Sequence, residues 1–175
     1  MLTKNFKSLM RGMLTGSASL TTTSGGSNTA GIYGEYYRYS SKPLSAFMSG
    51  KCQNVTTYGV FFGTDSTPAT ESDYTLGAPI TSGLSITSPS NYALSENADT
   101  GEVTYSAIFT VTNNSGADIN IYEIGWVCTH TQGSNSQTFC SLLDRTVLNE
   151  PIILPAGATK FITYEVTFRW ELILE

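Results

Sequence analysis

Residues 103–111 read Val-Thr-Tyr-Ser-Ala-Ile-Phe-Thr-Val, and this stretch indicates the fold class more directly than any other. The odd-numbered positions are apolar or aromatic, and the even-numbered positions carry hydroxyl groups except at Ile108. Successive side chains of a β-strand point to opposite faces. A period of two therefore predicts a strand with one buried and one exposed face.

Similar patterns lie on both sides of this stretch. We expect strands at 55–62, 84–87, 91–95, 118–129, 137–148 and 151–154, and a long final strand from about residue 160 to 174. Turn sequences and one long loop, 63–83, join them, and no helical pattern separates them. This order predicts an all-β fold, an antiparallel β-sandwich of the jelly-roll or Ig-like kind, over residues 51–175. An extended or partly helical N-terminal arm, 1–50, precedes it.

Residues 2–14 carry apolar side chains at the spacing of one helix face: Leu2, Phe6, Leu9, Met10, Met13 and Leu14. A helix of this length is marginal alone in water, so the apolar stripe needs a surface to lie on. Three alternatives stay open: the chain's own domain, a partner protein, or a membrane surface. We favour a partner, and expect that deletion of 1–31 leaves a folded body.

Residues 15–31 are rich in Gly, Ser and Thr and predict a flexible linker. A tyrosine-dense segment, 32–39, follows, and tyrosine provides large contact area at low entropic cost. The alternative is that these rings cover the chain's own core. The candidate assembly interface of the arm consists of Leu2, Phe6, Leu9, Met13, Tyr33, Tyr36, Tyr37 and Tyr39.

The charges are few and unevenly placed. Only 13% of the 175 residues are charged, against about 25% in typical soluble domains. This favours a subunit with many neighbours over a lone monomer. Residues 1–51 hold six basic residues and one acid, whereas 52–175 hold three basic residues and thirteen acids. Two explanations stay open for this asymmetry. It can arise by chance in a short chain, or the basic arm can dock on the acidic surface of a neighbouring subunit.

The strands 118–129 and 137–148 are expected to form a hairpin centred on Ser134, with a β-bulge near 123–125 where the apolar phase changes. This register sets Glu123 opposite Arg145 and predicts a structural ion pair. It also sets Cys128 opposite Cys140. An odd number of cysteines argues against a disulfide framework, so we expect reduced thiols in a reducing cytosol.

Motifs for chemistry are scarce. A zinc site needs more ligands than the single histidine, His130, offers, and neither phosphate-binding nor nucleophile motifs occur. Glu123 and Asp144 are the best pair for glycoside hydrolysis, but the expected ion pair competes with that role. We expect no enzyme, no cofactor and no metal. Neither a nucleic-acid surface, a membrane span nor a secretory signal is predicted.

Four pieces of the chain carry a resemblance to a known family. They are Gly63-Thr-Asp-Ser-Thr-Pro-Ala-Thr-Glu-Ser-Asp-Tyr-Thr-Leu-Gly-Ala-Pro-Ile, Phe109-Thr-Val-Thr-Asn-Asn-Ser-Gly, Ile121-Tyr-Glu-Ile-Gly-Trp, and Leu142-Leu-Asp-Arg-Thr-Val-Leu followed by Pro155-Ala-Gly. In this order they resemble β-sandwich segments of tailed-bacteriophage virion proteins over about residues 59–168.

The resemblance implies a non-enzymatic subunit of a head, neck or tail, present in many copies and assembled with itself and other virion proteins. The arm lies outside the resemblance and is expected to adapt the module to its attachment point. The alternative is a glycan- or receptor-binding module of a fibre or a capsid decoration. In that case Trp126 or Tyr122 would contact the sugar, although we favour core packing for both residues.

Overall fold

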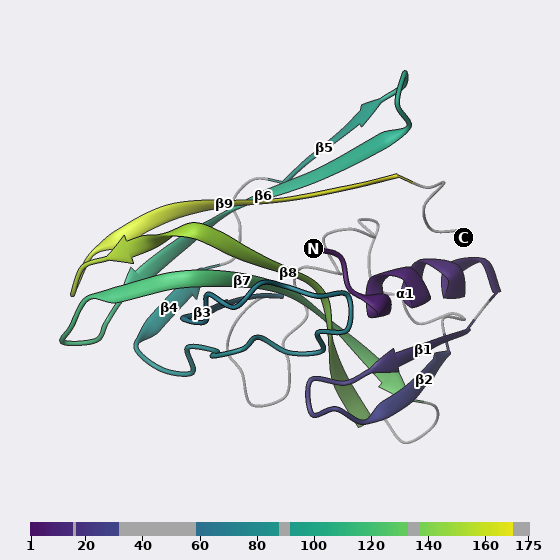
Figure 1. Cartoon of the computed structure of the whole chain (residues 1–175), viewed down its shortest axis with the longest axis horizontal. Helices are drawn as coiled ribbons and strands as arrows, with labels where there is room; N and C mark the ends of the chain where they lie inside the picture. Colours follow the sequence, from purple (N-terminus) through teal and green to yellow (C-terminus); the bar gives the residue numbers. More distant parts are fainter. Residues whose placement is uncertain (16, 32–58, 88–91, 133–136, 170–175) are drawn as a thin grey trace.

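The computed structural model describes residues 1–15, 17–31, 59–87, 92–132 and 137–169 (Figure 1). The elements in these ranges are α1 (Lys4–Thr15), β1 (Ser17–Thr21), β2 (Ser27–Gly31), β3 (Val60–Gly63), β4 (Leu84–Thr87), β5 (Tyr92–Asn97), β6 (Glu102–Asn113), β7 (Ile119–Gln132), β8 (Gln137–Leu154) and β9 (Thr159–Arg169). All pairings between these strands are antiparallel. The mostly-β, antiparallel character predicted from the sequence is therefore confirmed.

Strand β6 lies at the centre of the first sheet. It pairs with β9 from Glu102↔Arg169 to Thr112↔Thr159, and its other side pairs with β5 at one end and β4 at the other. Every second residue of β6 is buried, beginning at Val103, as the period of two predicts.

The second sheet has the order β3–β7–β8. Its inner face and that of the first sheet share one hydrophobic core. The first sheet contributes Val103, Tyr105, Ala107, Phe109, Val111, Ile162, Tyr164, Val166 and Phe168, and the second contributes Val60, Phe62, Ile121, Ile124, Trp126, Leu143 and Leu154. Strands β6 and β9 turn one face to this core, which explains why their buried residues alternate so regularly.

The N-terminal segment completes this core. Figure 1 shows α1 and the β1–β2 hairpin together at one end of the molecule, beside β7 and β8. Phe6, Leu9 and Leu20 are buried, and the Phe6 ring packs 5.2 Å from Phe168 and 6.0 Å from Trp126, between centroids. The N-terminal stripe therefore lies on its own domain, which was one of the three alternatives.

This packing corrects the expected interface. Phe6 and Leu9 are not available to a partner in this structure, and Leu2 is partly buried in a β-bridge with Asp144. The segment expected to be a flexible linker forms the β1–β2 hairpin instead. The side chain of Met13 and the whole of Tyr33, Tyr36, Tyr37 and Tyr39 lie outside the described residues.

The expected register of β7 and β8 is wrong by a small amount. Gly125 lies opposite Arg145, and Thr129, not Cys128, lies opposite Cys140. Register shifts occur between Ile121 and Glu123 and between Trp126 and Val127, so two irregularities flank the span where one bulge was predicted. At both shifts β8 advances by more residues than β7, and an extra residue on one strand moves every later pairing.

Two further expectations are corrected. Cys140 is disulfide-bonded, so the prediction of reduced thiols fails for this residue. The two strands expected at 137–148 and 151–154 are one strand, β8.

No helix in the described ranges is long and apolar enough to cross a membrane.

Candidate functional site

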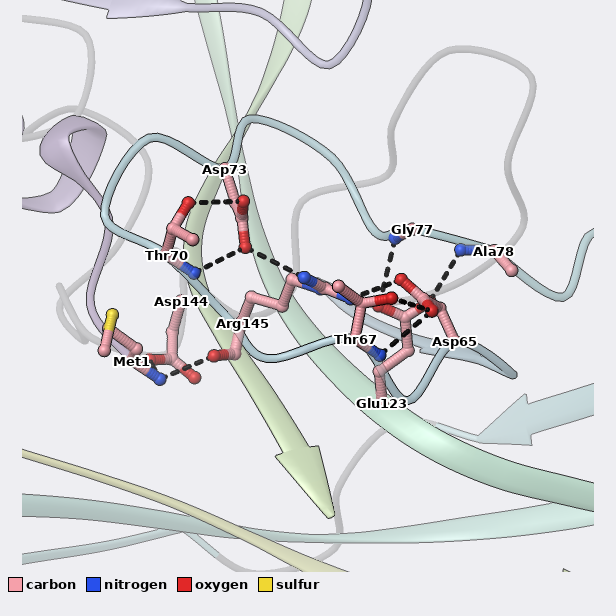
Figure 2. A network of polar contacts seen from close by, with 10 residues as sticks. All are labelled: Met1, Asp65, Thr67, Thr70, Asp73, Gly77, Ala78, Glu123, Asp144 and Arg145. Atoms are coloured by element: carbon pink, nitrogen blue, oxygen red, sulfur yellow. Dashed lines mark hydrogen bonds and ion pairs between the residues drawn. The ribbon is translucent and has the colours of Figure 1, made fainter. Parts of the chain in front are cut away.

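A buried arginine on β8 binds three carboxylates, two from the 64–83 loop and one from β7 (Figure 2). The side chain of Arg145 is 4% exposed. Its Nε donates to Glu123 Oε2 at 2.7 Å, Nη1 to Asp73 Oδ2 at 2.9 Å, and Nη2 to Asp65 Oδ2 at 2.8 Å. We call these four residues the arginine network. Each nitrogen of the guanidinium group therefore meets its own carboxylate, an arrangement that suits its rigid planar shape.

Glu123 is the most deeply buried member, with a fully buried side chain on β7. Besides Arg145, it accepts hydrogen bonds from two backbone amides of the 64–83 loop. Gly77 N–H donates to Oε2 at 3.0 Å, and Ala78 N–H donates to Oε1 at 2.8 Å. A buried carboxylate is stable only when paired and hydrogen-bonded, and both of its oxygens meet that requirement here.

Asp65 and Asp73 close short turns of the same loop. Asp65 Oδ1 accepts from the backbone and hydroxyl of Thr67, and Asp73 accepts from the backbone and hydroxyl of Thr70. The Thr67 amide and hydroxyl, with Arg145, hold the pKa of Asp65 below its ordinary value. For Asp73, burial opposes the shift, but the bonds from Thr70 and Arg145 outweigh burial and lower the pKa.

Arg145 keeps its charge despite its burial. Burial acts to lower the pKa of the guanidinium, but the hydrogen bonds and charges of Asp73 and Glu123 outweigh it, so the pKa is raised. Arg145, Asp65 and Asp73 are therefore charged at neutral pH. The network fixes the conformation of the loop, because two of its three carboxylates belong to that loop.

A second cluster surrounds the neighbouring residue, Asp144. Its Oδ1 lies 2.9 Å from the α-ammonium of Met1, and its Oδ2 accepts from the hydroxyls of Thr146 at 2.8 Å and Tyr164 at 2.5 Å. Tyr164 is fully buried, and burial, reinforced by the Asp144 charge, raises the pKa of its phenol well above the ordinary value. Tyr164 therefore remains a hydrogen-bond donor to this carboxylate.

Two glycines make room for the carboxylates. A side chain at Gly63 would overlap the Glu123 carboxylate, and one at Gly77 would overlap that of Asp65. Neither glycine has a positive φ, which is a common reason for glycine at a position. Both are glycines because the backbone passes close to the carboxylates of the network.

The structure brings together some of the residues singled out from the sequence. Glu123 and Arg145 form an ion pair, although they are not directly opposite in the register. Glu123 and Asp144, considered for hydrolysis, have all their carboxylate oxygens in hydrogen bonds or ion pairs. Trp126 is in the core, stacked 6.5 Å from Tyr105, so it is not placed to contact a sugar. Tyr122 is partly exposed.

Sequence reasoning missed the part played by the loop. No role was predicted for Asp65 and Asp73, and only their position in the resembling segment, together with Gly77, indicated one. The side chain of His130 lies outside the described ones. Among the described residues, no group of three or more histidines, cysteines and carboxylates is arranged to hold a metal ion.

Comparison with family models, with curated proteins and with solved structures found no match to this chain. The assignment of a function therefore depends on the residues and contacts described above.

Proposed function

We propose that this protein is a structural subunit of a tailed-phage virion, a head, neck or tail component that assembles with copies of itself and with other virion proteins. In this proposal the two antiparallel sheets form a β-sandwich of the jelly-roll or Ig-like kind. The protein acts in the virion and is assembled in the host cytoplasm.

One observation supports the proposal most strongly. Three of the four resembling segments, which lie far apart in the sequence, supply the four members of the arginine network: Asp65 and Asp73 from the first, Glu123 from the third, and Arg145 from the fourth. The polar side chains of these segments bind one another. This favours a module in which the residues that carry the resemblance maintain the fold, over one in which they act on a substrate.

The outer face of the first sheet suits a protein with close neighbours. It carries hydroxyl groups in cross-strand pairs, Thr104 with Thr167 at 2.8 Å and Thr112 with Thr159 at 2.9 Å. Phe161 stands among them and is 77% exposed. A face with few charges is easier to cover with another subunit than a highly charged one, because less desolvation opposes contact.

The burial of Phe6 and Leu9 changes where contacts with partners are sought. We place them on the exposed outer face around Phe161 and on the tyrosine-rich segment, Tyr33 to Tyr39, which remains a candidate on its sequence alone. Deletion of residues 1–31 is no longer a clean test, because it would remove three core side chains.

The test is direct detection in particles. Antibodies raised against the purified chain, used for immunogold electron microscopy and for blotting of density-purified virus particles, should label one substructure in many copies. Phe161→Ser should fold normally and lower the occupancy of the particle, whereas Thr87→Ser, a milder change on the same face, should not. Purified particles that lack the chain while it accumulates free in the lysate would contradict the proposal.

A further inference from the structure

The backbone and the side chain of Arg145 anchor two different segments. Its N–H donates to Met1 O at 3.0 Å and its C=O accepts from the Met1 ammonium at 2.5 Å, while its guanidinium group binds the loop carboxylates. In a β-strand the backbone groups lie in the plane of the sheet and the side chain stands out of it. One residue can therefore serve two partners at once.

The same edge of β8 holds the N-terminal segment at further points. Thr3 N–H donates to Leu143 O at 2.9 Å, and the Thr3 hydroxyl donates to Leu142 O at 2.7 Å. The Asn5 amide also donates to Leu142 O, at 3.1 Å. Thr3 and Asn5 are both buried. The segment 1–9 thus covers the strand edge beside the arginine network.

The two segments also contact each other. Lys4 N–H donates to Glu71 O at 2.9 Å, and Lys7 Nζ lies 3.1 Å from Glu71 Oε1. The loop itself adds little apolar burial: of residues 64–83, all of which the structure describes, Leu76 alone is buried. The order of the loop therefore depends on polar contacts, and such contacts weaken when water gains access to them.

We propose that segment 1–9 and loop 64–83 form one cooperative unit, anchored at Asp144–Arg145, so that undocking of the N-terminal segment releases the loop and release of the loop loosens the segment. The inference concerns the coupling of two parts of this chain and holds whether or not the chain is a virion subunit. Local openings of this kind are common where few apolar contacts hold a segment. Coupling between two sites is reciprocal. Undocking of segment 1–9 must therefore favour opening of loop 64–83 by the same factor as opening of the loop favours undocking of the segment.

The test uses amide hydrogen exchange by NMR on the full chain. Thr3→Val removes the Thr3 hydroxyl bonds at the N-terminal side and touches no loop residue. We expect exchange at the Arg145 amide, which donates to Met1, to become about fivefold faster, and exchange at the Gly77 and Ala78 amides to accelerate by a similar factor. Amides in the middle of β6 and β9 serve as an internal reference and should change less.

The reverse experiment starts from the loop. Asp73→Asn weakens one contact to Arg145, and it should accelerate exchange at the Thr3 and Arg145 amides as well as in the loop. Thr163→Val, on the exposed outer face of β9, is the matched control and should leave both segments unchanged. Acceleration confined to the mutated segment in either variant would overturn the proposal. Equal acceleration everywhere, including β6 and β9, would overturn it too, because it would mean that no local unit exists.

Discussion

Arg145 Nε lies 2.7 Å from Glu123 Oε2, although the residue directly opposite Arg145 on β7 is Gly125. The contact is a diagonal one, two positions along the strand, which a long side chain can bridge. Gly125 has no side chain, and one added there would meet Leu76 and Leu142. The arginine thus reaches past a glycine to the carboxylate, and both ends of the contact are buried.

Loss of this arginine should be strongly destabilising. Arg145→Met leaves Glu123 as a buried carboxylate without its cation, and breaking a buried pair from one side typically costs about 3–5 kcal/mol. We expect the free energy of unfolding, measured by urea denaturation, to fall by that amount. Arg169→Met is the matched control, because its ion pair with Glu102 is exposed. Its loss should change stability far less, and equal losses in the two variants would contradict this account.

The glycines beside the network should not tolerate a methyl group. Gly63→Ala and Gly77→Ala each place a Cβ into a carboxylate, and overpacking of this kind typically costs about 1–3 kcal/mol. Gly116→Ala has open space around the new Cβ and should change stability by less than about 0.5 kcal/mol. Thermal unfolding of the three variants would decide the matter. A neutral Gly63→Ala would mean that the carboxylate shifts at little cost.

Acid should weaken the loop through Asp65 and Asp73. In the folded protein the pKa of both carboxyls is lowered from the ordinary value of 3.8. Their contribution to stability is therefore complete above that pH and is lost as the pH falls through the lowered folded-state values. The double variant Asp65→Asn/Asp73→Asn should show a flatter dependence of unfolding free energy on pH below about pH 5 than the wild type.

The control for the acid experiment is Asp99→Asn, in the exposed β5–β6 turn. It should leave the slope at low pH close to that of the wild type. If the double variant and the wild type lose stability in parallel as the pH falls, other carboxylates dominate acid unfolding and the two loop aspartates are not a main source of it.

The N-terminal helix should behave as part of the core. Phe6→Ala removes a ring packed between Trp126 and Phe168, and truncation of a buried phenylalanine typically costs about 3–5 kcal/mol. Phe161→Ala removes a ring that is mostly in solvent and should cost less than about 0.5 kcal/mol. Calorimetry on both variants would test the pair. A small effect of Phe6→Ala would mean that the N-terminal segment is an independent arm after all.

Much of the fold could be predicted from local pattern. The alternation beginning at Val103 predicted the strand and its buried face, because a period of two is dictated by strand geometry. The register of β7 and β8 could not be predicted to the residue. The shifts after Ile121 and Trp126 depend on residues of β8 that bulge, and the apolar pattern of β7 contains no information about its partner.

The candidate site shows a similar limit. Glu123 and Arg145 could be paired because both lie on strands of one predicted hairpin. Asp65 and Asp73 could not be assigned to the site. A loop of twenty residues has no periodic pattern that indicates where its side chains point. The fate of the N-terminal stripe was open for another reason. The positions of Phe6 and Leu9 predict an apolar face, but amphipathicity does not say which surface covers it.

The arginine network also bears on how relatives of this chain would be recognised. A substitution at residue 145 leaves three carboxylates without their shared cation, and one at residue 65, 73 or 123 leaves a guanidinium nitrogen without its partner. Gly63 and Gly77 limit what can stand beside them. These six positions should therefore change together or not at all during evolution. Homologues too distant to align over their strands would still share this arrangement of six residues. Correlated substitution at the six positions would reveal it.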